Sequence, residues 1–246
     1  MNLALAAVLE RPDIWRGDAL AVLPAPTLPS GFAELDAELP GGGWPRGQLT
    51  ELLYADEGIG ELSLLMPAFS SLTASGKRVV LVLPPNGTSQ PHAPGWAAAG
   101  VELSQLIVLR PANVRDALWA TVESLRCAGV AATLAWPDAG ATRHGRPADA
   151  LSNSLRRLQT AAGEGGGCGF VLRPSACAVQ TSPAPLRLLL KPEAQCLRVE
   201  LIKRRGPPAR RPLLLPVARP LVSTLHRLAL ARPYSVVHQS RLVAFA

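Results

Sequence analysis

The residues with the clearest chemical signature lie in a short glycine-containing turn, Ala55–Leu62. An apolar, strand-like run over Gln48–Leu53 precedes the turn, and a helical apolar pattern begins at about Leu62. The same strand–loop–helix order places the motif GxxxxGK[ST] around nucleotide phosphates, because backbone N–H groups and a helix N-terminus bind anions there. The turn therefore has the outline of a phosphate-binding loop.

The side chains of this turn do not supply the chemistry of the motif. Gly60 matches the second glycine, whereas Ala55 stands at the first. Glu61 replaces the lysine that contacts the β- and γ-phosphates, and Leu62 replaces the Ser/Thr that ligates Mg²⁺. A carboxylate and an isobutyl group can do neither, and the carboxylate repels a triphosphate. Together with Gly58, these residues form a degenerate loop for which we expect neither a cofactor nor a metal ion.

Strand and helix patterns alternate around this loop. The apolar runs are short and unbroken, as in strands buried on both faces of a parallel sheet. Their order predicts an α/β fold with a mostly parallel sheet and flanking helices. The strands expected are Gln48–Leu53, Val79–Leu83, Leu106–Arg110, Ala131–Trp136 and Gly169–Arg173. The helices expected are Phe32–Leu39, one from about Leu62 that Pro67 delays or kinks, Gly95–Ala99, Val114–Leu125 and Ala148–Ala162.

The pattern changes in the last quarter of the chain. Two apolar runs, Leu186–Leu190 and Leu197–Ile202, predict an antiparallel hairpin appended to the parallel sheet. Gly206–Pro220 is rich in proline and arginine and has little periodicity, whereas Leu221–Ala229 could form a short helix. We therefore expect an N-terminal helix and linker over residues 1–24, a core domain over 25–205 and a basic Pro/Arg-rich extension over 206–246.

Composition places the chain among globular proteins with a full core. It has 246 residues, 48% of them hydrophobic, and its longest apolar runs are too short to cross a bilayer. The N-terminus lacks the basic region of a signal peptide. The four cysteines show neither CxxC pairing nor metal-ligand spacing, which predicts buried, reduced thiols. We expect a cytoplasmic protein.

Positive charge is concentrated near the C-terminus. Residues 197–246 hold ten Lys/Arg and one acidic residue, a net charge of +9, whereas residues 1–196 have a net charge of −2. Such asymmetry favours contact with DNA phosphates, largely independent of base sequence, or with an acidic protein surface. A solubilising extension is the remaining alternative. The candidate contact residues are Lys203, Arg204, Arg205, Arg210 and Arg211.

The segment before the loop, Leu28–Glu51, resembles the corresponding segment of RecA-family recombinases. That family's pattern runs approximately S-x-G-x-x-x-L-D-x-x-L-G-G-G-x-P-x-G-x-[IVL]-x-E. Gly76–Leu83 and Ala98–Pro111 resemble later core elements of the same family. The resemblance covers residues 25–205 and implies that this core is a RecA-like domain.

The chain departs from RecA where ATP would be hydrolysed. A glutamate that activates water follows the second core strand in RecA, but Pro84, Pro85 and Asn86 follow it here. Trp136 stands near the place of the Walker B aspartate, and Asp138 comes two residues late. Because the loop has also lost its lysine and its magnesium ligand, we expect no ATP turnover and no enzymatic activity.

This combination resembles the ImuA family, RecA-like and SulA-related proteins associated with translesion DNA synthesis. The shared features are the opening at Leu28–Gly47, the degenerate loop Gly58–Leu62 and the basic run Lys203–Gly206. The resemblance implies a non-catalytic scaffold for damage-induced mutagenesis in the bacterial SOS response. Its implied partners are an ImuB-like relative of Y-family polymerases, RecA and an error-prone replicative-type polymerase, with weak non-specific DNA contact.

Two other functions remain open on the sequence. A SulA-like inhibitor of cell division would also be a RecA-like protein of the SOS response without ATPase chemistry. A nucleotide-dependent DNA-binding enzyme would require residual activity in the degenerate loop.

Overall fold

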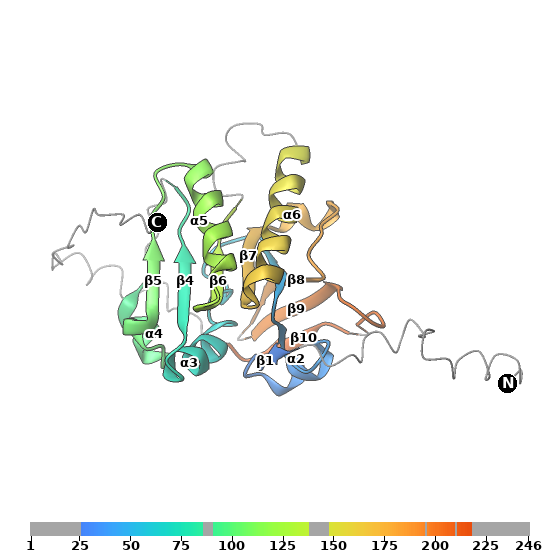
Figure 1. Ribbon diagram of the computed structural model, residues 1–246. Helices are drawn as coiled ribbons and strands as arrows, with labels where there is room; N and C mark the ends of the chain where they lie inside the picture. The colour runs from blue at the N-terminus through green and yellow to red at the C-terminus, as the bar shows by residue number, and fades with distance from the viewer. Residues whose placement is uncertain (1–25, 86–90, 138–147, 195, 210, 218–246) are drawn as a thin grey trace, which may run out of the picture.

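The computed structural model describes residues 26–85, 91–137, 148–194, 196–209 and 211–217. Within these ranges, five helices and ten strands form a layered α/β structure (Figure 1). The helices are α2 (Ala33–Glu38), α3 (Met66–Ala74), α4 (Ala93–Ala98), α5 (Val114–Arg126) and α6 (Ala148–Gly165). The strands are β1 (Thr27–Leu28), β2 (Trp44–Pro45), β3 (Gln48–Tyr54), β4 (Arg78–Val82), β5 (Leu106–Leu109), β6 (Val130–Ala135), β7 (Cys168–Pro174), β8 (Leu186–Glu193), β9 (Cys196–Lys203) and β10 (Leu213–Leu215).

Eight of these strands form one sheet in the order β10-β9-β8-β3-β7-β6-β4-β5. The neighbours from β8 to β5 run parallel, whereas β8–β9 and β9–β10 are antiparallel. The sheet therefore confirms the predicted mostly parallel α/β architecture with an antiparallel C-terminal hairpin. A small antiparallel pair, β1–β2, stands beside it.

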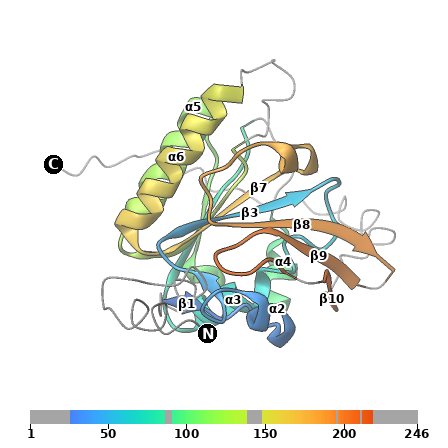
Figure 2. The same ribbon diagram turned by 90° about the vertical axis from the view of Figure 1, so that its right-hand side faces the viewer.

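The central parallel strands β3, β4, β6 and β7 are buried on both faces, to which successive side chains point in turn, whereas the edge strand β5 is partly exposed. On β4, Val79 and Leu81 join a large core cluster with α3 and α4, whereas Val80 and Val82 contact a cluster that includes α5. Figure 2 shows α5 and α6 on one side of the sheet and α2, α3 and α4 on the other. The unbroken apolar runs of the sequence follow from this two-sided burial.

Three features of the elements differ from the sequence prediction. Helix α3 begins at Met66, not at Leu62, with turns over residues 61–65 and proline in its first turn; the predicted delay by Pro67 is thus confirmed. Helix α6 continues to Gly165, beyond the expected end at Ala162. Strand β10 lies in the segment for which little periodicity was expected, and its Leu215 is buried opposite Leu197.

Other predictions fall outside the described residues. These are the N-terminal helix within residues 1–24 and the short helix Leu221–Ala229. Among the described residues, no helix combines the length and the apolarity that crossing a membrane requires.

Candidate functional site

The degenerate loop leaves the sheet at the end of β3 and turns on two glycines. Gly58 and Gly60 adopt φ angles of 80° and 103°, a region that residues with a side chain rarely enter. Ile59 between them is buried against the core and anchors the turn. This backbone directs successive N–H groups into one concavity, the arrangement that binds anions in phosphate loops.

The carboxylate of Glu61 fills that concavity. Its Oε1 accepts a hydrogen bond from the Gly58 backbone N–H at 3.1 Å, and its Oε2 accepts one from the Gly60 N–H at 3.1 Å. The residue is only 7% exposed. Glu61, at the position of the motif lysine, therefore takes the place that a phosphate oxygen would take, and it satisfies the loop internally.

The other loop positions have no phosphate-binding geometry. Ala55 is exposed, and Leu62 is half-buried and packs against the core. Helix α3 starts only at Met66, so its N-terminus does not follow the glycine turn directly as the motif requires. The loop keeps backbone N–H groups that could bind an anion, but these groups bind the loop's own Glu61 side chain.

A cavity of about 940 Å³ lies beside the loop. Tyr54 at the end of β3, Leu83 after β4 and Trp136 after β6 contribute to its wall. The carboxyl ends of parallel strands are where ligands bind in open α/β sheets. Further lining residues are Phe32, Glu57, Gly58, Gly60, Glu61, Leu62, Ser63, Met66, Pro67, Ser70, Ser71, Pro84, Pro91, His92, Gly95, Trp96, Ala99, Pro216 and Val217.

The degenerate positions thus meet in one place. Glu61 and Leu62 from the loop line the same cavity as Pro84 after β4 and Trp136 after β6. Two neighbouring candidates, Asn86 and Asp138, lie outside the described residues, and Ala55 does not line the cavity. Pro84 and Trp136 are apolar groups near the places where the resemblance to RecA would put acidic ones.

The cavity wall is mainly aromatic and aliphatic. Its charged residues within the described part of the chain are acidic, Glu57 and Glu61, and no lysine or arginine lines it there. His92 caps α4, because its Nδ1 accepts the Gly95 backbone N–H at 3.1 Å. The described part of the wall therefore offers no lysine or arginine that could neutralise a nucleotide triphosphate.

Sequence reasoning missed much of this wall. Phe32 and Trp96 come from segments with no ligand motif, and Pro216 and Val217 follow the unpredicted strand β10. A chain of aromatic contacts supports the wall from behind: Trp44 lies 5.4 Å from Phe170, centroid to centroid, and Phe69 lies 5.8 Å from Phe170 and 6.1 Å from Trp96. No local signal in the sequence links these residues.

A separate buried cluster surrounds Glu51, the last residue of the RecA-like opening. Its Oε2 accepts hydrogen bonds from Arg173 Nη1 at 3.0 Å and Arg187 Nε at 3.1 Å, and its Oε1 accepts one from Ser182. The three charged side chains are 0–7% exposed. Arg187 also donates to the carbonyls of residues 177, 178 and 180. The cluster connects β3, β7 and β8, and none of its residues lines the cavity described above.

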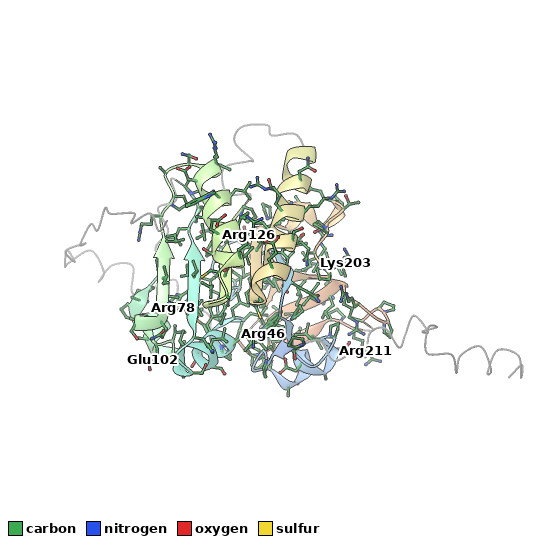
Figure 3. All side chains as sticks on the ribbon, in the orientation of Figure 1. Arg46, Arg78, Glu102, Arg126, Lys203 and Arg211 are labelled. Atoms are coloured by element: carbon green, nitrogen blue, oxygen red, sulfur yellow. The ribbon has the colours of Figure 1, made fainter. Side chains whose placement is uncertain are left out.

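The structure separates the predicted basic contact residues by environment. Arg204 is directed inward: its Nη1 contacts the Glu38 carboxylate at 2.6 Å and also the Glu38 carbonyl, and its side chain is 14% exposed. Arg205 and Arg211 are exposed, whereas Arg210 lies outside the described residues. In Figure 3, Lys203 and Arg211 lie on the side of the molecule formed by β8, β9 and β10.

Lys203 is exposed but makes a hydrogen bond to the fold. Its ammonium donates to the Ser182 carbonyl at 2.7 Å. Desolvation and the nearby Arg187 lower the pKa of Lys203, while Glu51 opposes this change. Of the predicted cations in the described part of the chain, only Arg205 and Arg211 are therefore presented to solvent without a side-chain role in the core.

The cysteines are only partly buried, contrary to the prediction. Cys168 and Cys177 are buried, Cys196 is half-buried and Cys127 is exposed. Burial raises the pKa of Cys168 to about 12, with a smaller opposing effect of Arg46. In the described residues no group of three or more His, Cys, Asp or Glu side chains could hold a metal ion.

Comparison with known proteins finds partial similarity to RecA. The chain is 31% identical over 114 residues to Protein RecA of Picosynechococcus sp. (strain ATCC 27264 / PCC 7002 / PR-6), a match covering 46% of this chain and 31% of that protein. It is 32% identical over 92 residues to Protein RecA of Lactobacillus delbrueckii subsp. bulgaricus, covering 37% of this chain and 27% of that protein. No known protein-family profile matches the chain. The chain thus spans less than a third of the RecA proteins it matches, and it is distantly related to them through a RecA-like α/β fold.

Proposed function

We propose that this protein is a non-catalytic, RecA-like scaffold of the ImuA type that acts in bacterial translesion DNA synthesis. The observation that carries the proposal is the Glu61 carboxylate in the concavity formed by the Gly58 and Gly60 N–H groups. A RecA-like protein that fills its own phosphate site folds without nucleotide. Its function then rests on its surfaces and not on ATP turnover.

The partners follow from the resemblance at Leu28–Gly47, Gly58–Leu62 and Lys203–Gly206. We propose binding to an ImuB-like relative of Y-family polymerases in the cytoplasm, together with RecA and an error-prone replicative-type polymerase. Weak, sequence-independent contact with DNA would add to these protein contacts. The exposed Arg205 and Arg211 support a contact with an acidic surface or with phosphates.

The first prediction is that the purified protein does not hydrolyse ATP. Glu61 and Leu62 remove the groups that neutralise the phosphates and hold Mg²⁺, and Pro84 and Trp136 provide no acid in their place. Phosphate release from Mg-ATP with single-stranded DNA should equal the buffer rate, with a RecA protein as the positive control. The variant Glu61→Lys should remain inactive because the metal ligands are still missing. Turnover that a loop substitution abolishes would contradict the prediction.

The cellular role is tested by deletion, overproduction and co-purification. Deletion of the gene should reduce damage-induced mutagenesis, and the tagged protein should retain the polymerase relative after DNA damage. Overproduction should not produce filamentous cells. Filamentation on overproduction, with an unchanged mutation frequency in the deletion strain, would instead identify a SulA-like division inhibitor.

A further inference from the structure

The cavity beside the degenerate loop has a pre-formed apolar wall. Four of its lining residues, Met66, Leu83, Trp96 and Val217, are also buried members of the main core cluster. Packing against the core therefore fixes their positions. The cavity volume of about 940 Å³ lies near the upper end of the range of ligand sites in proteins, which is roughly 300–1,000 Å³. The wall thus offers contact surface for a ligand with more than one bulky apolar group.

Two carboxylates give this apolar cavity a negative charge. Glu61 is 7% exposed, and its carboxylate accepts the N–H groups of Gly58 and Gly60 but forms no ion pair with a described residue. Glu57 is exposed on the same wall and likewise has no ion-pair partner in the described ranges. A partly desolvated carboxylate without a counter-charge attracts a cation more strongly than the same group does in water.

This lining determines the charge of a matching ligand. No lysine or arginine among the described residues lines the cavity, so a phosphate or another anion meets only repulsion from side-chain charges there. A neutral apolar ligand would cover the wall but would leave the charges of Glu57 and Glu61 uncompensated. The ligand that fits both properties is apolar and carries positive charge beside its apolar groups.

The negative surface continues beyond the cavity wall. Asp56, next to Glu57, is exposed, and so is Glu34 on α2, two residues after the lining residue Phe32. A single cationic group can face only one of these acids, whereas a peptide with several lysines or arginines can face them all. Peptide segments that place apolar anchors in a groove are a recurring mode of recognition, and buried anchors of this kind dominate the binding energy of interfaces.

We propose that the cavity is the anchor site for a basic, apolar segment of a partner protein. Bulky apolar side chains of that segment enter the cavity beside Trp96 and Trp136, and its lysines or arginines face Glu57 at the rim. The inference rests on the proposed function, because it gives a scaffold without ATP turnover a place to hold a partner. This partner surface is basic, in contrast to the acidic surface or phosphates that Arg205 and Arg211 would contact.

Titration of the full-length protein with synthetic peptides tests the proposal. The probe is a short peptide in which leucine–phenylalanine pairs alternate with lysines. One comparison peptide has glutamates in place of the lysines, and another has serines in place of the leucines and phenylalanines. Calorimetry should give the probe a dissociation constant lower than that of either comparison peptide by about tenfold or more, since charge and apolar contact both contribute. Equal binding of all three peptides, or none, would overturn the proposal.

Substitutions in the wall test whether the probe binds in the cavity. Ser71 is exposed and lines the cavity, so S71R adds a bulky cation there and should weaken probe binding by about tenfold or more. Its control is A74R, at an exposed position of the same helix that does not line the cavity. E57K should weaken probe binding by up to about fivefold, whereas E102K, at an exposed glutamate away from the cavity, should bind like the wild type. Equal weakening in each variant and its control would overturn the proposal.

Hydrogen exchange locates the bound probe. Amides of residues 57–62 and 93–99 should exchange more slowly in its presence, and those of α5 should be unchanged. Protection of α5 without protection of these two segments would place the peptide elsewhere and overturn the proposal. If S71R lowers the melting temperature, A99R replaces it, because Ala99 is an exposed lining residue at the end of α4.

The peptide titration and the test of the proposed function can fail separately. ATP turnover by the protein would contradict the non-catalytic scaffold whatever the peptides do. A protein without turnover that binds the three peptides equally would refute only the anchor site.

Discussion

The side chain of Glu61 decides what the glycine turn can bind. Backbone N–H groups at Gly58 and Gly60 must find acceptors, because the turn is largely buried. In a phosphate loop the acceptor is a ligand, whereas here it is a carboxylate one and three residues away along the chain. The stability of the loop therefore depends on Glu61.

The second prediction is that Glu61→Ala destabilises the protein although the residue has no catalytic role. Removing the carboxylate leaves two N–H groups without their acceptor, at a cost of about 1–3 kcal/mol in the free energy of unfolding. Urea denaturation measures this cost. Glu57→Ala, on the exposed rim of the same loop, is the control and should stay within about 0.5 kcal/mol of wild type. Equal stability of the two variants would show that the loop does not rely on Glu61.

The third prediction concerns the buried cluster around Glu51. In Glu51→Gln, Arg173 and Arg187 lose their shared counter-charge inside the protein, which should cost about 3–5 kcal/mol. The control is Glu164→Gln, whose Glu164–Arg126 ion pair at 2.6 Å is about half-exposed and should contribute less than about 1 kcal/mol. Urea denaturation compares the two. A cost for Glu51→Gln as small as that of the control would contradict the prediction.

The sequence predicted the degenerate loop but not the role of Glu51. The degenerate loop was found because its glycines and its missing lysine stand within eight residues, Ala55–Leu62. The role of Glu51 was not found, because its partners Arg173 and Arg187 lie 122 and 136 residues away along the chain. Local residue spacing cannot predict an ion pair between residues so far apart in the sequence. The hydrogen bonds of Glu61 were missed for another reason: a carboxylate was judged by its repulsion of phosphate and not by its own bonding capacity.

At the scale of elements, the parallel strands were predicted well because two-sided burial leaves unbroken apolar runs. The expected strands Val79–Leu83 and Ala131–Trp136 correspond to β4 and β6 within one residue at each end. Strand β10 was missed because three leucines between prolines and arginines show no period of their own. Its pairing with β9 supplies the order that the local sequence lacks.

Helix α6 shows how packing overrides a local signal. Its last turn passes through Gly163 and Gly165, which favour a turn in isolation. At Gly165, a Cβ would lie 1.9 Å from the Leu125 carbonyl oxygen, so α6 ends against the backbone of α5. The absence of a side chain is what allows this approach.

The fourth prediction compares these two glycines. Gly165→Ala forces α6 away from α5 and should destabilise the protein by about 1–3 kcal/mol. At Gly163 an added Cβ makes only an ordinary contact, 3.8 Å from the Gly47 carbonyl oxygen, so Gly163→Ala should be neutral or stabilise by up to about 1 kcal/mol. Thermal denaturation should give a lower melting temperature for Gly165→Ala and an equal or higher one for Gly163→Ala. A shared decrease would mean that α6 tolerates no added methyl at this end.

At the scale of the whole molecule, the protein has a RecA-like fold, but the positive charge of its described residues lies away from the cavity beside the loop. Described residues of the cavity wall carry no lysine or arginine, whereas the β8–β10 side carries Lys203, Arg204, Arg205 and Arg211. Two of these four cations are engaged within the chain: Arg204 contacts Glu38 in a largely buried pair, and the exposed Lys203 donates to the Ser182 carbonyl. In the described part of this region, a partner therefore meets fewer available positive charges than the net charge of residues 197–246 suggests.

The fifth prediction separates the exposed cations from the internal one. R205A/R211A removes two exposed charges and should leave the melting temperature unchanged while it weakens partner capture. If the contact is with DNA phosphates, the variant should bind all sequences more weakly, and its salt slope should fall by up to about one per lost contact. Arg204→Ala should instead lower stability, because Glu38 loses a partner that is only 14% exposed. Unchanged capture and unchanged DNA binding in R205A/R211A would show that this side of the sheet makes no such contact.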